Sequence, residues 1–158
     1  MMVYFEDVVI GEKSFLGSHL FTRDEMVAFA SEWDPQPFHV DEAAARGSIF
    51  SSIVASGWHT GCIAMRLIVD ARKAFEDARR SRGEATPPLG VSPGMRNLGW
   101  PVLTRPGDEL SYFSEVLDKR ETKRPQWGLV HLRTTGVNQN GELAIAFESW
   151  AFVARRGV

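Results

Sequence analysis

Apolar positions spaced three and four apart predict an amphipathic helix over residues 23–33. A short strand over residues 18–22 is predicted directly before it. Thr22 and Glu25 have the spacing of a capping box, in which the Thr22 hydroxyl accepts from a backbone N–H and the Glu25 side chain reaches back. The helix should end at Asp34, because the proline that follows disfavours helical conformation in the residue before it. The apolar positions with helical spacing are Met26, Val27, Phe29, Ala30 and Trp33.

A second, longer helix is predicted from Trp58 to about Arg82. Its first half is apolar on nearly every side, which is typical of a fully enclosed helix, whereas its charged second half should emerge into water. Between the two long helices we expect a proline-stiffened loop over residues 34–39, a small helix from the Asp41 cap through Arg46, and a loop over residues 48–54.

After a loop over residues 83–94, the rest of the chain has the pattern of β-strands. The predicted strands cover residues 95–104, 109–118, 128–137 and 143–154, with turns at 105–108 and 138–141. Helices first and antiparallel strands afterwards make the fold class α+β, with an antiparallel β-sheet wrapped around a long central helix. No repeat or linker divides the chain, so residues 1–158 are expected to form a single domain.

The composition narrows the class of protein. With 44% apolar and 24% charged residues the chain is typical of a soluble globular protein. Its net charge of -2 disfavours nucleic acid as a partner, and its longest apolar stretch, residues 62–69, is too short to cross a membrane. A single cysteine excludes an intrachain disulfide and favours a reducing compartment. Because the first residues do not resemble a signal peptide, a cytoplasmic location is expected.

Two short segments carry candidate chemistry, and the first is the loop that contains Asp34 and His39. Its two prolines fix the backbone, so that a carboxylate and an imidazole are held close together. Such a pair can bind one water between them, with one group taking its proton while the other donates. The same pattern also arises from an ordinary helix stop followed by a surface or structural histidine.

The second segment is Ser56-Gly57-Trp58, at the start of the longer helix. The first N–H groups of a helix have no intrahelical partner, and a glycine lets another group approach the backbone closely. If the Gly57 amide faces a thioester carbonyl, it can stabilise the negative oxygen that forms when water adds to the conjugated double bond. The alternative interpretation is that Gly57 only permits tight helix packing.

Four segments together carry a family resemblance: residues 34–42 (Asp-Pro-Gln-Pro-Phe-His-Val-Asp-Glu), residues 53–60 (Ile-Val-Ala-Ser-Gly-Trp-His-Thr), Met65-Arg66-Leu67 and the turn at 105–108. In these segments the chain resembles the MaoC-like dehydratases, relatives of the (R)-specific enoyl-CoA hydratases, over about residues 5–153. The resemblance implies a hotdog fold, a homodimer or higher oligomer with its sheets side by side, and syn addition of water to a trans-2-enoyl-CoA. By the same resemblance, Asp34 and His39 match the catalytic pair, and Gly57 matches the glycine whose N–H polarises the thioester carbonyl.

Substrate contacts are expected at several further residues. The acyl chain should lie in a tunnel beside the central helix, with its width set by Phe38, Trp58, Met65 and the loop over 83–94. Ser56, which stands where the hydratases often have histidine, is also assigned to substrate binding. Arg105, Lys123 and Arg124 are candidates for the CoA phosphates, as charge-assisted contacts favour. For the basic hairpin tip over residues 119–124, the alternative is a solvated turn that protects the strand ends.

No metal or separate cofactor is expected, since CoA is part of the substrate. His59 and Cys62 lie one helical turn apart, but two ligands make a poor zinc site and no third ligand is evident. Cys62 is therefore expected to pack in the core, and His19 and His131 to be structural or exposed.

Two other functions remain open at this point. A hotdog acyl-CoA thioesterase shares the implied fold, but many such enzymes place a carboxylate on the central helix, and residues 57–69 contain no Asp or Glu. A non-catalytic acyl-thioester binding protein is the second alternative. It would bind the ligand and turn nothing over.

Overall fold

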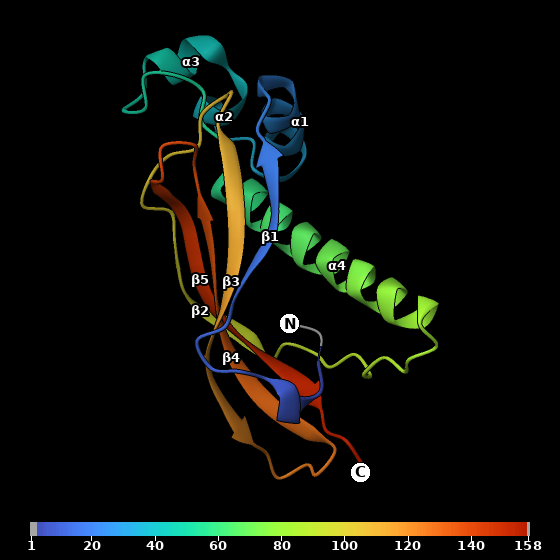
Figure 1. Cartoon of the computed structure of the whole chain (residues 1–158). Helices are drawn as coiled ribbons and strands as arrows, with labels where there is room; N and C mark the ends of the chain where they lie inside the picture. The colour runs from blue at the N-terminus through green and yellow to red at the C-terminus, as the bar shows by residue number, and fades with distance from the viewer. Residues whose placement is uncertain (1–2, 158) are drawn as a thin grey trace.

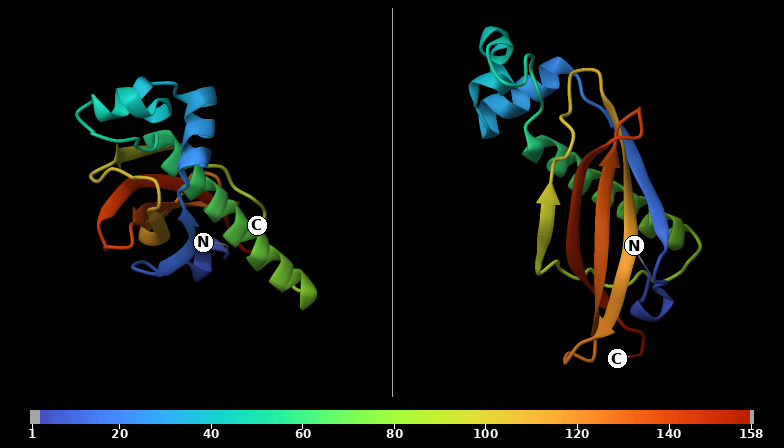
Figure 2. Two further views of the ribbon diagram at one scale, coloured as in Figure 1. Left: turned by 90° about the horizontal axis from the view of Figure 1, so that it is seen from above. Right: turned by 90° about the vertical axis from the view of Figure 1, so that its left-hand side faces the viewer.

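A computed structural model describes residues 3–157 and has the α+β hotdog architecture that the sequence predicts. Five antiparallel strands form one sheet in the order β1-β3-β4-β5-β2, and the long helix α4 crosses one face of it (Figure 1). The views in Figure 2 show the short helices gathered beyond one end of the sheet. The elements are η1 (Phe5–Asp7), β1 (Lys13–Leu20), α1 (Arg23–Trp33), α2 (Pro37–Val40), α3 (Glu42–Arg46), α4 (Gly57–Ser81), β2 (Gly94–Gly99), β3 (Glu109–Glu121), β4 (Trp127–Val137) and β5 (Leu143–Ala154).

The N-cap of α1 is confirmed only in part. The Thr22 hydroxyl accepts from the Glu25 N–H at 3.3 Å, as a capping residue does. The Glu25 carboxylate, however, does not reach back to the cap, because it accepts hydrogen bonds from the imidazoles of His19 and His59 instead. The second half of the predicted capping box is therefore wrong, and Glu25 is free to join elements that lie far apart in the sequence.

The segment between α1 and α4 contains more helix than the sequence predicts. Residues 34–39 were expected to be loop, but Pro37–Val40 forms the short helix α2, in which Pro37 occupies the first turn, where its missing N–H costs nothing. The α3 prediction is confirmed, with the Asp41 carboxylate accepting from the Ala44 N–H at 2.7 Å. Together α2 and α3 bring His39 back toward the start of α4.

Three strand boundaries differ from the predicted ones, at places where the alternation of side chains is broken. β1 starts at Lys13 rather than at residue 18, because a β-bulge between Phe15 and Gly17 interrupts the period of two. β2 ends at Gly99 rather than at residue 104, after a second irregularity between Arg96 and Gly99. β3 continues to Glu121, where polar residues pair with β4 and give no apolar pattern to read.

The first half of α4 is not fully enclosed, so that prediction is wrong for the single chain. Thr60 and Ala64 are buried, and the Tyr112 hydroxyl donates to the Thr60 carbonyl at 3.0 Å. The opposite side is open: Trp58, Met65 and Val69 are 57%, 49% and 52% exposed, and Cys62 is exposed as well. These four residues, spaced four, three and four apart, are called the α4 stripe below. They lie on one helical face that the sheet of the same chain does not cover.

The main core lies between α1, the sheet and the buried side of α4. Its largest fully buried side chains include Phe21, Met26, Tyr112, Leu110 and Ile145. Among the helices of residues 3–157, none combines the length and the apolar character needed to span a bilayer.

Candidate active site

Asp34, His39 and Gly57, which the sequence predicts to act together, line one cleft of about 280 Å³. Asp34 is the C-cap residue of α1, His39 lies in α2, and Gly57 is the first residue of α4. Three separate element ends therefore meet at this point. In Figure 1, α2 and the start of α4 lie at the end of the sheet where the short helices gather.

The Asp34 carboxylate is held by two neutral donors. Its Oδ2 accepts from the Ser56 hydroxyl at 2.6 Å, and its Oδ1 accepts from the Gln36 side-chain amide at 2.9 Å. Burial acts to raise the pKa of Asp34, but these two hydrogen bonds and the nearby His39 outweigh it, and the net pKa is lowered. Asp34 is therefore ionised at neutral pH, and both of its oxygens are oriented.

The tautomer of His39 follows from its contact with the backbone. Its Nδ1 lies 2.7 Å from the Val54 carbonyl oxygen, which can only accept, so Nδ1 carries the hydrogen. In the neutral ring Nε2 then bears a lone pair, and it faces Oδ2 of Asp34 at 3.4 Å. Two acceptors thus converge on one place, where a water molecule can donate a hydrogen bond to each of them.

Gly57 presents an N–H for which no acceptor lies among residues 3–157. The Ser56 hydroxyl accepts from the next N–H, that of Trp58, at 3.2 Å. A side chain at position 57 is excluded, because an added Cβ would lie 2.5 Å from Cε2 of Trp100. The Trp100 indole also donates to the Gly57 carbonyl at 2.9 Å. The glycine therefore serves close packing and at the same time leaves one amide of the helix N-terminus free for a ligand.

The other predicted contact residues near the cleft differ in their exposure. Phe38 and Trp58 line it. Ser56 is fully buried and bonds Asp34, a position suited to orienting that carboxylate. Arg105 donates to the Ser52 hydroxyl and to the Phe50 carbonyl, and so holds the loop that forms one wall. Their assignment to substrate binding stays a prediction.

Lys123 and Arg124 are not brought to the cleft. They lie in the turn between β3 and β4, at the end of the sheet opposite to the short helices (Figure 1). The 13 residues of β3 span roughly 40 Å between the two ends. Within one chain, the geometry does not support the prediction that they bind the phosphates of a ligand held at Asp34.

A second, mostly apolar cavity of about 280 Å³ lies between α4, β5 and the loop that follows α4. It divides the residues that the sequence assigns to one acyl tunnel. Met65 and loop residues from Pro87 to Ser92 line this cavity, whereas Phe38 and Trp58 line the cleft with Asp34.

Sequence reasoning missed three groups of the site. Gln36 lies inside the motif with Asp34, and a short polar side chain two positions after a carboxylate is a usable local signal. The Val54 carbonyl and the Trp100 indole gave no signal, since they reach His39 and Gly57 only through the tertiary fold.

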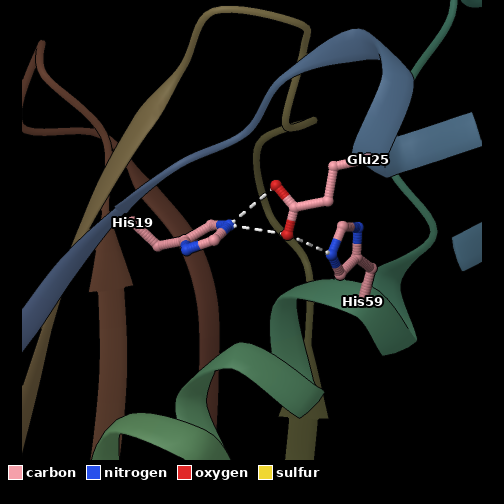
Figure 3. Close-up of side chains that lie close together, drawn as sticks. All are labelled: His19, Glu25 and His59. Carbon is pink, nitrogen blue, oxygen red and sulfur yellow. Dashed lines mark hydrogen bonds and ion pairs between the residues drawn. The ribbon is translucent and has the colours of Figure 1, made fainter. Parts of the chain in front are cut away.

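A separate cluster is formed by His19 of β1, Glu25 of α1 and His59 of the first turn of α4 (Figure 3). Burial lowers the pKa of His59, while the nearby Glu25 carboxylate acts to raise it. The ring is stacked on Phe29, with 4.5 Å between the centroids. Among residues 3–157, these side chains form the group whose donor atoms suit a metal ion.

Comparison with known proteins identifies the family and the fold. A model of the MaoC-like domain matches residues 17–138, which is more than half of the chain. The crystal structure of a MaoC-like dehydratase from Rhodospirillum rubrum is 36% identical, with a TM-score of 0.81 and 99% of each chain covered.

Curated relatives give less detail about activity. A protein of Bacillus subtilis described as uncharacterised, YdeM, is 29% identical over 146 residues, which cover 89% of this chain and 95% of that protein. The β-methylmalyl-CoA dehydratase of Chloroflexus aurantiacus is 30% identical over 79 residues. That match covers 47% of this chain and 22% of the dehydratase, so the chain corresponds to only a part of that enzyme.

Proposed function

The chain belongs to the MaoC-like domain family, and from this premise we propose that it is a hydro-lyase that reversibly adds water to a trans-2-enoyl-CoA to give the 3-hydroxyacyl thioester. The observation that carries the proposal is the convergence of the Asp34 carboxylate and the bare Nε2 of His39, 3.4 Å apart, in the cleft that Gly57 also lines. The name of the relative β-methylmalyl-CoA dehydratase contains a CoA thioester, and this supports the proposed substrate class.

In the hydration direction, the water oxygen bonds to Cβ and the electrons of the double bond move to the thioester oxygen. The free N–H of Gly57 stabilises the enolate that forms there. The Asp34–His39 pair takes one proton from the water and returns it to Cα, so the step is balanced. Asp34 helps to deprotonate the water, while His39 positions it and, once its Nε2 has taken up the proton, helps to deliver that proton to Cα. Because both groups act from one side of the cleft, the hydroxyl and the proton add to the same face. A carboxylate with a lowered pKa is a weak base, so the reaction depends strongly on orientation and on charge stabilisation at Gly57.

The apolar cavity beside α4 is the natural place for the acyl chain, since apolar walls favour a ligand without charge. Met65 lines this cavity and also belongs to the α4 stripe. The reaction needs no cofactor beyond the CoA of the substrate.

A homodimer fits the surface of the chain. The α4 stripe exposes four apolar side chains, and β2 is an edge strand with unpaired backbone groups on one side. A second copy whose β2 pairs with this β2, and which covers the α4 stripe, would satisfy the unpaired backbone groups and bury the exposed apolar side chains. The single cysteine fits a reducing compartment, and the cytoplasm is the location proposed.

A panel of trans-2-enoyl-CoA substrates of graded length tests the proposal, with hydration followed as loss of absorbance of the conjugated thioester. We expect turnover by the wild-type chain, and a loss of about 100-fold or more in His39→Ala. The matched control is His131→Ala, which removes another histidine that faces a carboxylate, and it should retain turnover. Equal activity in both variants would exclude the assignment.

The same substrates separate the two alternatives. Release of free thiol without hydration would identify a thioesterase, although residues 57–69 offer no carboxylate for that reaction. Binding of enoyl-CoA without any turnover would identify a non-catalytic binding protein. Either result would replace the hydro-lyase proposal.

A further inference from the structure

The cluster of His19, Glu25 and His59 joins three elements that are distant in the sequence. His19 lies on β1, Glu25 on the first turn of α1, and His59 on the first turn of α4. Nε2 of His19 lies 2.9 and 3.1 Å from the two Glu25 oxygens, and Nε2 of His59 lies 3.3 Å from one of them (Figure 3). Both imidazoles therefore point at one carboxylate.

These distances match the edges of a metal coordination shell. Ligands at about 2.0–2.1 Å from a tetrahedral zinc ion are roughly 3.3 Å from one another. In the cluster, the three donor atoms all lie within 4.8 Å of one another, and the two nitrogen–oxygen distances are 2.9 and 3.3 Å. The remaining distance, between the two nitrogens, is at most 4.8 Å, so small side-chain movements bring all three donor atoms to one ion.

We propose that His19, Glu25 and His59 bind one divalent transition-metal ion of the zinc class, with a fourth coordination position left for solvent. Two imidazole nitrogens and a carboxylate oxygen are a donor set that this class prefers, whereas calcium and magnesium prefer oxygen ligands alone. The side chains of His19 and Glu25 are 27% and 37% exposed, so an ion has a path into the cluster and a water can complete its shell.

The environment of His59 suits this role. Its side chain is 4% exposed and stacks on Phe29, which fixes the direction of Nε2. Its Nδ1 is buried and has no hydrogen-bond partner among residues 3–157. When a metal replaces the proton on Nε2, the proton moves to Nδ1. One unsatisfied acceptor then becomes one unsatisfied donor, so the change adds no new unsatisfied group.

Elsewhere in the described chain, the comparable groups lack a full set of ligands. His131 faces Glu148 at 2.8 Å, but the remaining neighbours of that carboxylate are Arg96, Arg133 and Asn97, which bind no metal. Cys62, which the sequence places one turn from His59, is not part of the cluster. The two further ligands that the sequence did not reveal beside His59 would be His19 from β1 and Glu25 from α1.

An ion at this place would cross-link β1, α1 and α4. His59 lies two residues after Gly57, so the ion would fix the first turn of α4 directly. Glu25 lies at the opposite end of α1 from Asp34, so the ion would hold α1 by its first turn. Its role would be to hold these elements together, and it would take no part in the proton transfers.

Metal-free protein, prepared with a chelator, is titrated with Co²⁺ and followed by visible absorption, and Zn²⁺ is then added as competitor. We expect one Co²⁺ per chain with the bands of a four- or five-coordinate ion, displaced by Zn²⁺. Zn²⁺ at a hundredfold excess over its Kd should raise the Tm by about 5–10 °C. The variants His19→Ala and Glu25→Gln, both at partly exposed positions, should weaken binding by about 100-fold or more.

Two matched controls make the result specific. His131→Asn removes a histidine from a histidine–carboxylate pair, and Cys62→Ser removes the thiol near His59; both should bind Co²⁺ as the wild type does. The proposal is overturned if the wild type shows no saturable binding, if His19→Ala binds with unchanged affinity, or if His131→Asn loses the ion. Because no readout here is hydration of a substrate, failure of this proposal is separate from failure of the proposed function.

Discussion

Two histidine–carboxylate pairs of this chain combine the same chemical groups but differ in their surroundings. Asp34 and His39 face each other at 3.4 Å, and the donors that hold Asp34 are the neutral groups of Ser56 and Gln36. Glu148 and His131 are 2.8 Å apart on the sheet, where His131 stacks on Trp150 with its ring centroid at 4.7 Å.

The pKa values alone do not separate the two pairs. Hydrogen bonds from Asn97, Arg96 and His131 lower the pKa of Glu148, and the pKa of Asp34 is lowered as well. The difference lies in charge and access. Two arginines already compensate Glu148, and His131 bonds it directly, so the pair is closed. Asp34 has no lysine or arginine in contact among residues 3–157, and its oxygens border a cleft. A histidine–carboxylate pair that has no arginine partner and borders a cleft is the one suited to proton transfer.

The largest difference between the pairs is expected when each carboxylate becomes an amide. Asp34→Asn should lower kcat for enoyl-CoA hydration by about 10³-fold, because the anion that receives the proton is lost. Glu148→Gln should stay within about twofold of wild type, as expected for a change away from the reacting atoms. Both variants are assayed at the same pH after circular dichroism has established folding. A larger loss in Glu148→Gln would reverse the assignment of the two pairs.

The next largest effect should come from Gly57→Ala. The new Cβ collides with the Trp100 indole, so the first turn of α4 and its free N–H must shift. Removal of an oxyanion donor costs about 10²–10³ in kcat, and a similar loss is expected here. The control is Gly61→Ala, where the nearest atom to a new Cβ lies 3.9 Å away. If both alanines behave alike, helix propensity rather than the position of the amide explains the loss.

A smaller effect is expected when the hydroxyl that orients Asp34 is removed. Ser56→Ala should lower kcat by about tenfold through poorer orientation. It should also raise the pKa of Asp34, because the hydrogen bond from Ser56 lowers it. In the proposed mechanism Asp34 acts as the ionised carboxylate, so activity should fall as the pH drops through its pKa. A raised pKa then moves the acid limb of the profile to higher pH. The profile of kcat/KM against pH measures this, and an unmoved acid limb together with full activity would contradict it.

The smallest effect is expected far from both pairs. Lys123→Ala combined with Arg124→Ala should leave KM within about twofold of wild type, since the β3–β4 turn lies at the other end of the sheet. Arg105→Ala, at a position that holds a wall of the cleft, is the comparison. A clear rise of KM in the double variant alone would restore the predicted contact with the CoA phosphates.

The sequence predicts those parts of the molecule that local patterns determine. Spacing along the chain predicts the Thr22 cap, the length of α4 and the positions of the long strands in the sequence. The motif around Asp34 and His39 identifies one wall of the cleft. The broken alternation at Gly17 hides the start of β1, because a bulge shifts the side chains by one position.

Contacts between distant residues account for most of what the sequence does not predict. The Val54 carbonyl that fixes the His39 tautomer is 15 residues away, and Trp100 is 43 residues from the glycine on which it packs. Glu25 has the spacing of a capping residue, yet its carboxylate serves His19 and His59. Local spacing identifies a residue type and its helix, but only the tertiary fold decides which partner it meets.

The close approach of Trp100 to Gly57 makes these two positions interdependent. Any side chain at position 57 requires a smaller residue at position 100, and a smaller residue there removes the indole that donates to the Gly57 carbonyl. A double-mutant cycle with Gly57→Ala and Trp100→Ala should therefore be strongly non-additive, since the second substitution relieves the collision that the first creates. In related sequences we therefore expect substitutions at positions 57 and 100 to occur together, or both residues to be retained.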